Sequence, residues 1–365
     1  MKKHFEDNSE FEFKFENLFG NTICPANWKM TPQDFQVSEV LNVVFTGEGE
    51  FLWVYVEKTN LNTETLAKYI AKALRINVDK LSWSGLKDKV SISKQWFSIH
   101  LGGKVILDKF QERLELAQEG QANWKILEYQ VHQKKLRVGT HDFNGFEVNV
   151  QLNDQTGGAL EVNTVPQEII IERLAKIKAG GFPNYFGSQR FGKKFSNLKT
   201  AQQLFDHKKK IPTRHLKGLA LSASRSWLFN HQVSKRILSD KFDKAILGDV
   251  FVFETSSSLF TDIDDQISQR ILDLEVHPTA LLPGQGNDLS SADSLVLEYQ
   301  IEALYPSWVR SLKDHKVKKD RRAIRALASD LAWEFNGSIL TLKFQLKKGS
   351  YASSLLNCVF DLSHS

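Results

Sequence analysis

A single carboxylate, Asp88, lies just before a strand-like segment and could act in acid–base or nucleophilic chemistry. It lies between Lys87 and Lys89 in "SWSGLKDKVSISKQWFSIH", Ser82 to His100, whose second half alternates like a strand. A carboxylate can act as nucleophile or general base if it is ionised and held in place, and a nearby cation favours ionisation. On an extended strand both flanking lysines would point away from Asp88, so we expect its ion partner elsewhere. A polar turn leading into a strand would give the same letters, so the stretch alone leaves both interpretations open.

The rest of the sequence lacks the common motifs of metal and nucleotide chemistry. HExxH, GxxxxGK[ST] and GxGxxG are missing, and no nucleophile-elbow pattern occurs. The ten histidines are scattered, and Cys24 and Cys358 are far apart, in neither a CxxC nor a Cys/His cluster. We therefore expect no metal and no cofactor, which leaves carboxylate chemistry.

Composition indicates a globular protein with more than one core. At 365 residues the chain exceeds the usual size of a single core, and 41% hydrophobic with 25% charged residues is typical of a folded protein. Two cysteines indicate a reducing compartment. The N-terminus alternates acids with phenylalanines and so lacks a signal-peptide core, and no apolar run reaches the roughly 20 residues of a membrane helix. We expect a soluble cytoplasmic protein.

Basic residues gather in two clusters. Residues 190–217 hold nine Lys/Arg and one acid, and residues 310–325 hold eight and two, in a chain of net charge +5. With aromatic residues nearby, such clusters are typical of proteins that follow a phosphate backbone and stack on bases. The alternative is a pair of solvated turns or helix faces.

Hydrophobic periodicity divides the chain into β-rich ends and a mainly helical middle. Strands are expected at 34–45, at 50–59 and in several stretches up to residue 152, and a helix at about 62–76. Near the end, Asn336 and Gly337 predict the tight turn of a hairpin, and a short helix is expected at about 350–358. The simplest architecture is an α/β (α+β) sheet domain formed by both termini, 1–179 and 319–365, with an inserted domain at 180–318.

Four strings in the chain resemble motifs of one family, the TruD family of tRNA pseudouridine synthases. "SGLKDKVSISKQWFSI" is similar to the signature that contains the family's catalytic aspartate, and the other three follow in the family's order. Two further strings, "KMTPQDFQVSEV" near the start and "GSYASSLL" near the end, resemble family motifs more weakly, so the resemblance covers nearly the whole chain. The three further strings are "GGFPNYFGSQRFG" (180–192), "LSASRSWLFNHQVSKRI" (221–237) and "ALLPGQG" (280–286).

The resemblance implies a fold and an activity. The fold would be a pseudouridine synthase catalytic domain, with a mixed, largely antiparallel sheet, interrupted by a mainly helical TRUD domain. The activity would be isomerisation of uridine 13 of tRNA to pseudouridine, an intramolecular transfer that needs no cofactor or metal. The family also implies tRNA as the partner, with no membrane and no protein partner, and a monomer.

Five residues take roles from this resemblance. Asp88 would be catalytic, and Lys29 would be the cation that keeps it ionised. Phe146 would stack on the flipped base, and Asn144 would hydrogen-bond near the base or the catalytic loop; the alternative is a strand-turn pair, with the Phe buried and the Asn capping the turn. Arg190 would contact RNA or the active site, or would serve packing at the domain junction.

Some positions depart from the family pattern. Phe143 replaces a common glycine before Asn144, Lys347 and Lys348 replace a proline and a small residue, and Asn357 with Cys358 replaces a frequent Arg-Glu pair. An alternative function is a noncatalytic RNA-binding protein or RNA chaperone on the same scaffold, which would not need Asp88. A nucleic-acid glycosidase or nuclease is disfavoured, because the sequence shows neither a second carboxylate at a spacing typical of a catalytic pair nor a metal-binding motif. Whether the aspartate attacks the sugar, attacks the base or removes a proton stays open.

Overall fold

The structure, a computed structural model, describes residues 11–101, 107–118, 123–161 and 164–362. Residues 1–10, part of the segment in which we expected no signal peptide, lie outside this set. The chain divides into two compact units, each assembled from three stretches of sequence. We call them the sheet unit (residues 23–172, 328–349 and 360–362 of the described chain) and the helical unit (residues 11–22, 173–327 and 350–359). The helical unit thus includes both an N-terminal and a C-terminal stretch besides the middle of the chain. The division into catalytic and inserted domains stays a prediction.

One large mixed sheet forms the sheet unit. Its neighbouring strands are antiparallel except for two parallel pairs, β2 with β5 and β1 with β16, as expected for a mixed, largely antiparallel sheet. Short strand β4 (Leu81–Trp83) pairs with β5, and β1 (Cys24–Trp28) pairs with β7 and with β16 (Phe360–Asp361). The main path runs β14 (Ala328–Asn336), β15 (Ile339–Lys347), β7 (Phe143–Leu152), β2 (Phe35–Val40), β5 (Ile92–His100), β3 (Phe51–Thr59) and β6 (Trp124–His132).

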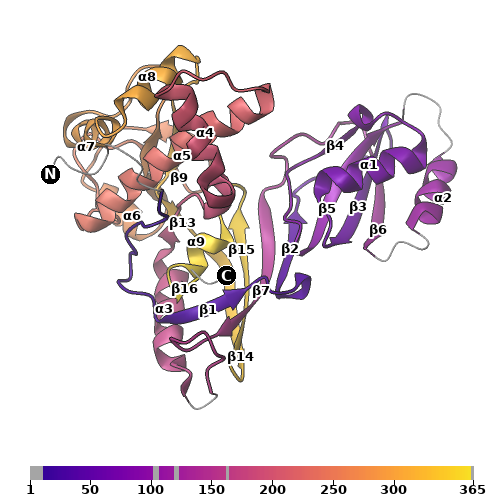
Figure 1. Cartoon of the computed structure of the whole chain (residues 1–365), viewed down its shortest axis with the longest axis horizontal. Coiled ribbons are helices and arrows are strands. Elements are labelled where there is room, and N and C mark those ends of the chain that lie inside the picture. Colours follow the sequence, from indigo (N-terminus) through magenta and orange to yellow (C-terminus); the bar gives the residue numbers. More distant parts are fainter. Residues whose placement is uncertain (1–10, 102–106, 119–122, 162–163, 363–365) are drawn as a thin grey trace. The chain divides into compact units, whose positions relative to one another are not determined.

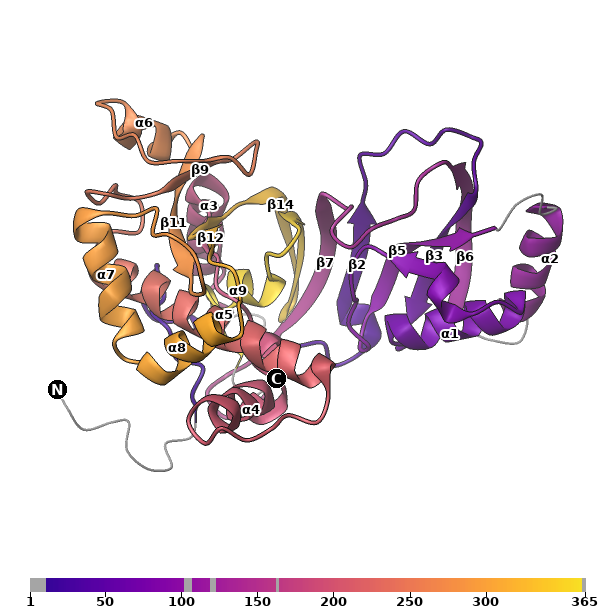
Figure 2. The same cartoon turned by 90° about the horizontal axis from the view of Figure 1, so that it is seen from above.

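Helices α1 (Thr63–Leu74) and α2 (Leu107–Gln118) pack against one face of strands β5, β3 and β6 (Figure 2). Side chains at alternate positions of β3 face this layer because successive residues of a strand point to opposite sides. Leu52, Val54 and Val56 are fully buried there with Leu66 and Ile70 of α1. The expected helix at 62–76 is therefore confirmed, and its apolar spacing is what attaches it to the sheet.

The hairpin between β14 and β15 is present, but its turn differs from the prediction by one residue. Asn336 pairs with Ile339 as the last pair of the ladder, so Gly337 and Ser338 make the turn. Only glycine takes positive φ there, at 61°. Asn336 is drawn into the strand because this register places alternate residues of β15 on the core face. These buried residues are Leu340, Leu342, Phe344 and Leu346.

The helical unit combines helices with two small sheets (Figure 1). One sheet has the order β10-β9-β11-β12 and the other pairs β13 with β8, so the middle of the chain is less purely helical than its periodicity suggests. Helix α3 (Gln167–Gly180) contributes to both units and is followed by Gly181 at positive φ. The other helices are α4 (Ser196–Phe205), α5 (Arg214–Leu238), α6 (Ile267–Leu272), α7 (Ala292–Glu302), α8 (Pro306–Asp314) and α9 (Ala352–Leu356). The strands are β8 (Phe182–Pro183), β9 (Phe251–Phe253), β10 (Leu259–Phe260), β11 (Val276–Leu282), β12 (Asp320–Ala323) and β13 (Arg325–Ala326).

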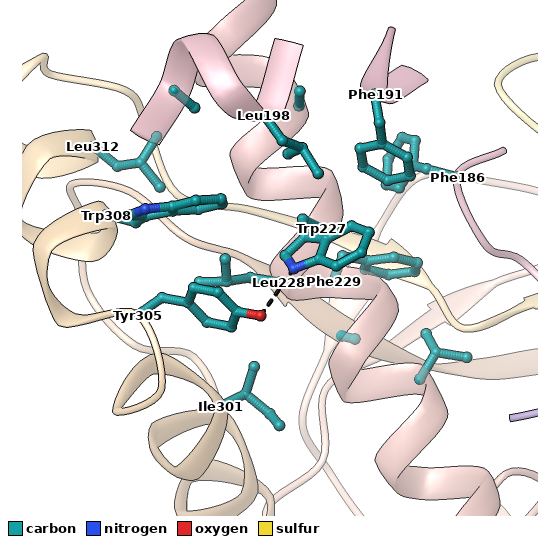
Figure 3. Packing of buried hydrophobic residues seen from close by; sticks show 14 of the residues in the cluster. Phe186, Phe191, Leu198, Trp227, Leu228, Phe229, Ile301, Tyr305, Trp308 and Leu312 are labelled. Atoms are coloured by element: carbon teal, nitrogen blue, oxygen red, sulfur yellow. Dashed lines mark hydrogen bonds between the residues drawn. The ribbon is translucent and has the colours of Figure 1, made fainter. Parts of the chain in front are cut away.

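Trp227 of α5 lies in the middle of the core of the helical unit (Figure 3). Its indole N–H donates a hydrogen bond of 2.9 Å to the hydroxyl of Tyr305, which satisfies the polar edge of the buried ring. Phe186 and Phe191, from the string "PNYFGSQRFG", are buried in the same cluster. Within the described helices, none is both long and apolar enough to span a bilayer.

Candidate active site

Asp88 lies in the loop between β4 and β5 and forms an ion pair with Lys29. Lys29 follows β1 directly and adopts the left-handed conformation, φ 56°, which sharply redirects the chain before the next residues. Its ammonium also lies 3.8 Å from the ring centroid of Phe35 and 4.3 Å from that of Trp28. Burial lowers the pKa of Lys29, and the Asp88 carboxylate opposes that shift. The Asp88 side chain is 28% exposed, so a substrate can reach it.

Lys87, the residue before Asp88, is held by a different carboxylate. Its ammonium donates to Glu39 at 2.7 Å, and the second oxygen of Glu39 accepts the backbone N–H of Trp96 at 3.0 Å. The backbone N–H of Lys87 donates to the Thr63 hydroxyl at 3.0 Å. The loop is therefore fixed immediately before Asp88, and Lys87 points away from it as the extended geometry predicts.

A third lysine, Lys58 at the end of β3, holds Asp88 through the main chain. The side chain is fully buried, and its ammonium donates to the Asp88 carbonyl at 2.7 Å and reaches the Ser93 hydroxyl at 3.5 Å. The Ser91 hydroxyl donates to the same carbonyl at 2.8 Å. Burial lowers the pKa of Lys58 to about 8; the charge of Asp88 raises it and that of Lys87 lowers it.

Lys58 and Phe146 lie on the same face of the sheet, as the register of the strands between them shows. Directly paired residues of neighbouring strands share a face, and the pairs Lys58–Ser93, Ser93–Val37, Val37–Phe146 and Phe146–Phe344 form one row. The Phe146 ring is half-buried and stacks on Phe344, with centroids 5.2 Å apart. It also lies 5.9 Å from the ring of Phe35, which carries the Lys29 ammonium on its face. The ion pair and Phe146 thus belong to one site.

Asn144, two residues before Phe146 on the same face, is oriented by a histidine. Its amide nitrogen lies 3.2 Å from Nε2 of His141, whose Nδ1 is hydrogen-bonded to the Ser84 hydroxyl. Burial lowers the pKa of His141 to about 4, so the ring is neutral near pH 7 and has one donor and one acceptor. With Nε2 accepting from Asn144, Nδ1–H donates to Ser84. The Asn144 carbonyl oxygen is left buried with no hydrogen-bond partner among the described residues, so it is available as an acceptor.

Comparison with known proteins identifies the family of this chain. The model of the family "tRNA pseudouridine synthase D (TruD)" matches residues 22–210 and 196–359, which is most of the chain. The chain belongs to the tRNA pseudouridine synthase D family. Asp88, Lys29, Asn144 and Phe146 all lie within the matched residues.

Individual relatives support the membership along the whole length. The chain is 35% identical over 350 residues to tRNA pseudouridine synthase D of Hydrogenovibrio crunogenus, covering 95% of this chain and 96% of that one. It is 36% identical over 347 residues to the protein of the same name from Stutzerimonas stutzeri, covering 94% and 95%. A solved structure from Methanosarcina mazei, provisionally named tRNA pseudouridine synthase D, shares the fold with TM-score 0.68 at 20% identity, over 94% of this chain and 95% of that one.

Arg190, in the string "GGFPNYFGSQRFG", lies in the helical unit. It stands on the short 3-10 helix Ser188–Phe191, and its guanidinium donates to the hydroxyls of Ser226, at 3.2 Å, and Ser222, both on α5. The guanidinium carbon is also 5.4 Å from the Phe186 ring centroid. The structure therefore gives Arg190 packing contacts within its unit, and a role in binding RNA stays a prediction.

The basic residues of the second cluster divide into inward-facing arginines and exposed side chains. Arg321, Arg322 and Arg325 are turned inward: Arg321 pairs with the buried Glu298, Arg322 lies 4.3 Å from the Phe186 ring centroid, and Arg325 donates to a backbone carbonyl. The exposed lysines and arginines of the two clusters lie on the 3-10 helix Lys193–Phe195, on α4, from the α4–α5 loop to the start of α5, and on and just after α8. They are Lys193, Lys194, Lys199, Lys208, Lys209, Lys210, Arg214, Arg310, Lys313, Lys316 and Lys318.

Two residues of the site, Lys58 and Glu39, are missing from the predicted set. Each carries a signal in the sequence, because each is a charged residue in phase with the apolar side of a strand. Lys58 continues the series Leu52, Val54 and Val56, and Glu39 stands two residues after Val37. A charge at such a position is costly unless it has a partner, and so marks a candidate functional network.

Proposed function

We propose that the chain isomerises uridine 13 of tRNA to pseudouridine, with Asp88 as the catalytic residue. The observation that carries the proposal is the ion pair between Asp88 and Lys29, which holds a reachable carboxylate. The Lys29 ammonium lies on the ring of Phe35, whose centroid is 5.9 Å from that of Phe146. Membership of the TruD family supplies the reaction class. The choice of position 13 and a monomeric state rest on the resemblance of the motifs, and a cytoplasmic location rests on the composition of the chain.

The isomerisation is chemically balanced within one nucleotide. The bond between N1 of the base and C1′ of the ribose breaks, a bond between C5 and C1′ forms, C5 loses a proton and N1 gains one. The reaction consumes no oxidant or reductant. The enzyme must flip the uridine out of its stack, assist breaking of the glycosidic bond, and keep the detached base in place while it turns.

Asp88 is placed for the bond-breaking or proton-transfer step. A carboxylate can attack the sugar carbon, attack the pyrimidine or take a proton from the ribose, and each route needs an ionised group in a fixed position. Lys29 neutralises the charge from one side, while Lys58 and Ser91 fix the backbone carbonyl. The three routes share this arrangement, so it supports Asp88 without selecting among them.

Phe146 and Asn144 are placed to hold the base. The half-buried Phe146 ring is backed by Phe344, which makes it a rigid surface for stacking. The free carbonyl oxygen of Asn144 can accept a hydrogen bond from an N–H of uracil. Asn144 also donates to Nε2 of His141, three residues earlier in the chain, and the strand-turn pair stays the alternative for Asn144 and Phe146.

The exposed lysines and arginines of the helical unit are placed to contact tRNA phosphates. The α4–α5 loop and the end of α8 lie in one unit. Burial lowers the pKa of His315, just after α8, and the charge of Lys217 on α5 lowers it further, which indicates that the two basic clusters approach each other there. We propose that the exposed residues contact the phosphates first and Arg190 second, because Arg190 also donates hydrogen bonds to α5 within its unit.

The deciding experiment is the Asp88→Asn variant of the full chain, which keeps the shape of the side chain and removes its charge. We expect release of tritium from C5-labelled uridine in tRNA to be lost while tRNA binding, measured by filter retention, persists. A tRNA with cytidine at position 13 should release nothing from that site. Full activity of Asp88→Asn would overturn the catalytic assignment, and binding without turnover by the unaltered chain would favour the RNA-binding alternative.

A further inference from the structure

Lys58 occupies a position that packing alone would give to an apolar residue. Strand β3 presents Leu52, Val54 and Val56 to the helices, and the next residue in phase is Lys58, with no exposed surface. Its stem can pack there, but its ammonium is taken out of water with it. A leucine or methionine would fill the same space without that cost, so the charge needs another explanation.

The Lys58 ammonium donates its hydrogen bonds to neutral oxygens, and the shorter of the two is to the backbone of Asp88. One is the Asp88 carbonyl at 2.7 Å, and the other is the Ser93 hydroxyl at 3.5 Å. The Ser91 hydroxyl donates to the same carbonyl and lies 2.6 Å from that of Ser93. The carbonyl of Asp88 is therefore held from the interior of the sheet by a cation and a hydroxyl together.

Holding this carbonyl fixes the direction of the Asp88 side chain. The Leu86–Lys87 peptide, one before the peptide that enters Asp88, is already anchored by the hydrogen bond from the Lys87 N–H to Thr63. Since Lys58 anchors the peptide that follows Asp88, the loop is held on both sides of this residue, and the carboxylate is paired with Lys29. A small displacement of a reacting group lowers a rate severely, so this anchor acts on the chemical step.

We propose that Lys58 is a positioning residue of the isomerisation, acting on Asp88 through the backbone carbonyl and, by its charge, on the carboxylate. The inference rests on the proposed function, because it assigns Lys58 a part in the step that Asp88 performs. It predicts that removal of the ammonium lowers kcat and leaves tRNA binding nearly unchanged.

The pH dependence gives a readout that a purely structural lysine would not affect. Four charged groups surround the ammonium or its neighbours: Asp88, its partner Lys29, and the pair of Lys87 and Glu39. Since burial lowers the pKa of Lys58 to about 8, the cation is lost as pH rises through that value. We expect kcat of the unaltered chain to fall on the alkaline side of about pH 8.

The test compares Lys58→Met and Lys58→Arg with the matched control Lys125→Met. Lys125 lies on strand β6, pairs with Glu57 and is largely exposed. We expect kcat of Lys58→Met to fall at least about tenfold at pH 7, with the alkaline decline near pH 8 gone and the Kd for tRNA within about twofold. Lys125→Met should keep both the rate and the pH profile. Since arginine stays charged throughout this range, Lys58→Arg should also lack the decline near pH 8.

An alkaline decline that stays at its original pH in Lys58→Met would overturn the proposal, as would unchanged kcat. If Lys58→Met fails to fold by circular dichroism, the profile of Lys58→Arg decides in the same way. Failure of the proposed function can be told apart from failure of the Lys58 inference, because it would appear as absence of turnover in the unaltered chain. Turnover that is lost in Asp88→Asn, with Lys58 variants indistinguishable from the unaltered chain, would overturn only this inference.

Discussion

The Glu39 carboxylate accepts a hydrogen bond from Lys87 Nζ at 2.7 Å, and both side chains are almost completely shielded from solvent. Glu39 lies on β2 and Lys87 in the loop before β5, so the pair ties the loop that carries Asp88 to the sheet. The same carboxylate accepts the backbone N–H of Trp96. Breaking this pair therefore affects both the stability of the sheet unit and the placement of Asp88.

We expect Glu39→Gln to lower the free energy of unfolding by about 3–5 kcal/mol, because it leaves the buried Lys87 ammonium without its carboxylate. Urea unfolding measures the loss. The control Glu334→Gln, at an exposed position of β14, should change stability by no more than about 0.5 kcal/mol. Replacing both partners, as Glu39→Leu with Lys87→Met, should recover a large part of the loss. Equal stability of Glu39→Gln and the unaltered chain would show that the pair is not stabilising.

Lys29→Met should lower kcat roughly a hundredfold, because Asp88 loses the cation that holds its carboxylate in place. The variant keeps most of the length of the side chain and removes the ammonium that lies over the Phe35 ring. Tritium release from C5-labelled tRNA gives the rate. Lys89→Met is the matched control, since Lys89 is an exposed lysine directly after Asp88 in the chain. The kcat of this variant should change by no more than about twofold. Comparable losses in both variants would mean that general loss of positive charge, rather than the ion pair, is responsible.

The sheet unit should lose stability as pH falls from about 6.5 toward about 4, because His141 is held neutral in the folded state. Its folded pKa, about 4, is below the usual 6.5, so protonation favours the unfolded chain over this window and the stability is fully present only above pH 6.5. Between pH 7 and pH 5 this amounts to about 2 kcal/mol. Urea unfolding at both pH values should show that His141→Gln loses about that much less than the unaltered chain. His207→Gln, in an exposed loop, should keep the original slope, and an unaltered slope in His141→Gln would exclude His141 as its source.

Phe15→Ala should destabilise the helical unit by about 2–3 kcal/mol, below the value for a completely buried phenylalanine. The ring stacks on Tyr185, with centroids 5.4 Å apart, and meets Trp227 and His231 edge-on. Thermal unfolding followed by tryptophan fluorescence reports the change. Lys14→Ala, one residue away and exposed, should have little effect. Similar effects of both variants would show that the N-terminal stretch contributes through its backbone and not through its alternating rings.

Local patterns in the sequence predicted those elements whose hydrophobic face is regular. The spacing of Leu66, Ile70 and Leu74 predicted α1, and the alternation along β15 predicted its buried side. The turn was predicted one residue too early because Asn-Gly is a good turn by itself, whereas the core face of β15 determines the register. A local preference gives way to burial of a whole strand face.

The basic clusters show a limit of charge counting. Arg321, Arg322 and Arg325 look like surface charges in the sequence, yet they are partly or largely buried in the helical unit. Their partners lie far away along the chain: Glu298 for Arg321, and Asn184 and Phe186 for Arg322. Periodicity cannot show such pairs, because a short strand such as β12 exposes or buries a side chain according to what packs on it.

Hydrophobic alternation in the sequence determined the β-rich ends of the chain, and the family motifs implied the mixed sheet, Asp88 as the candidate catalytic residue and Lys29 as its cation. Only the tertiary structure decided how the loop around Asp88 is held. Lys29, Lys58 and the pair of Glu39 with Lys87 come from separate strands and loops, and they meet because strand pairing sets their register. The physical reason is that an ion pair or a buried ammonium depends on distances of a few ångströms, which the fold imposes and sequence separation does not.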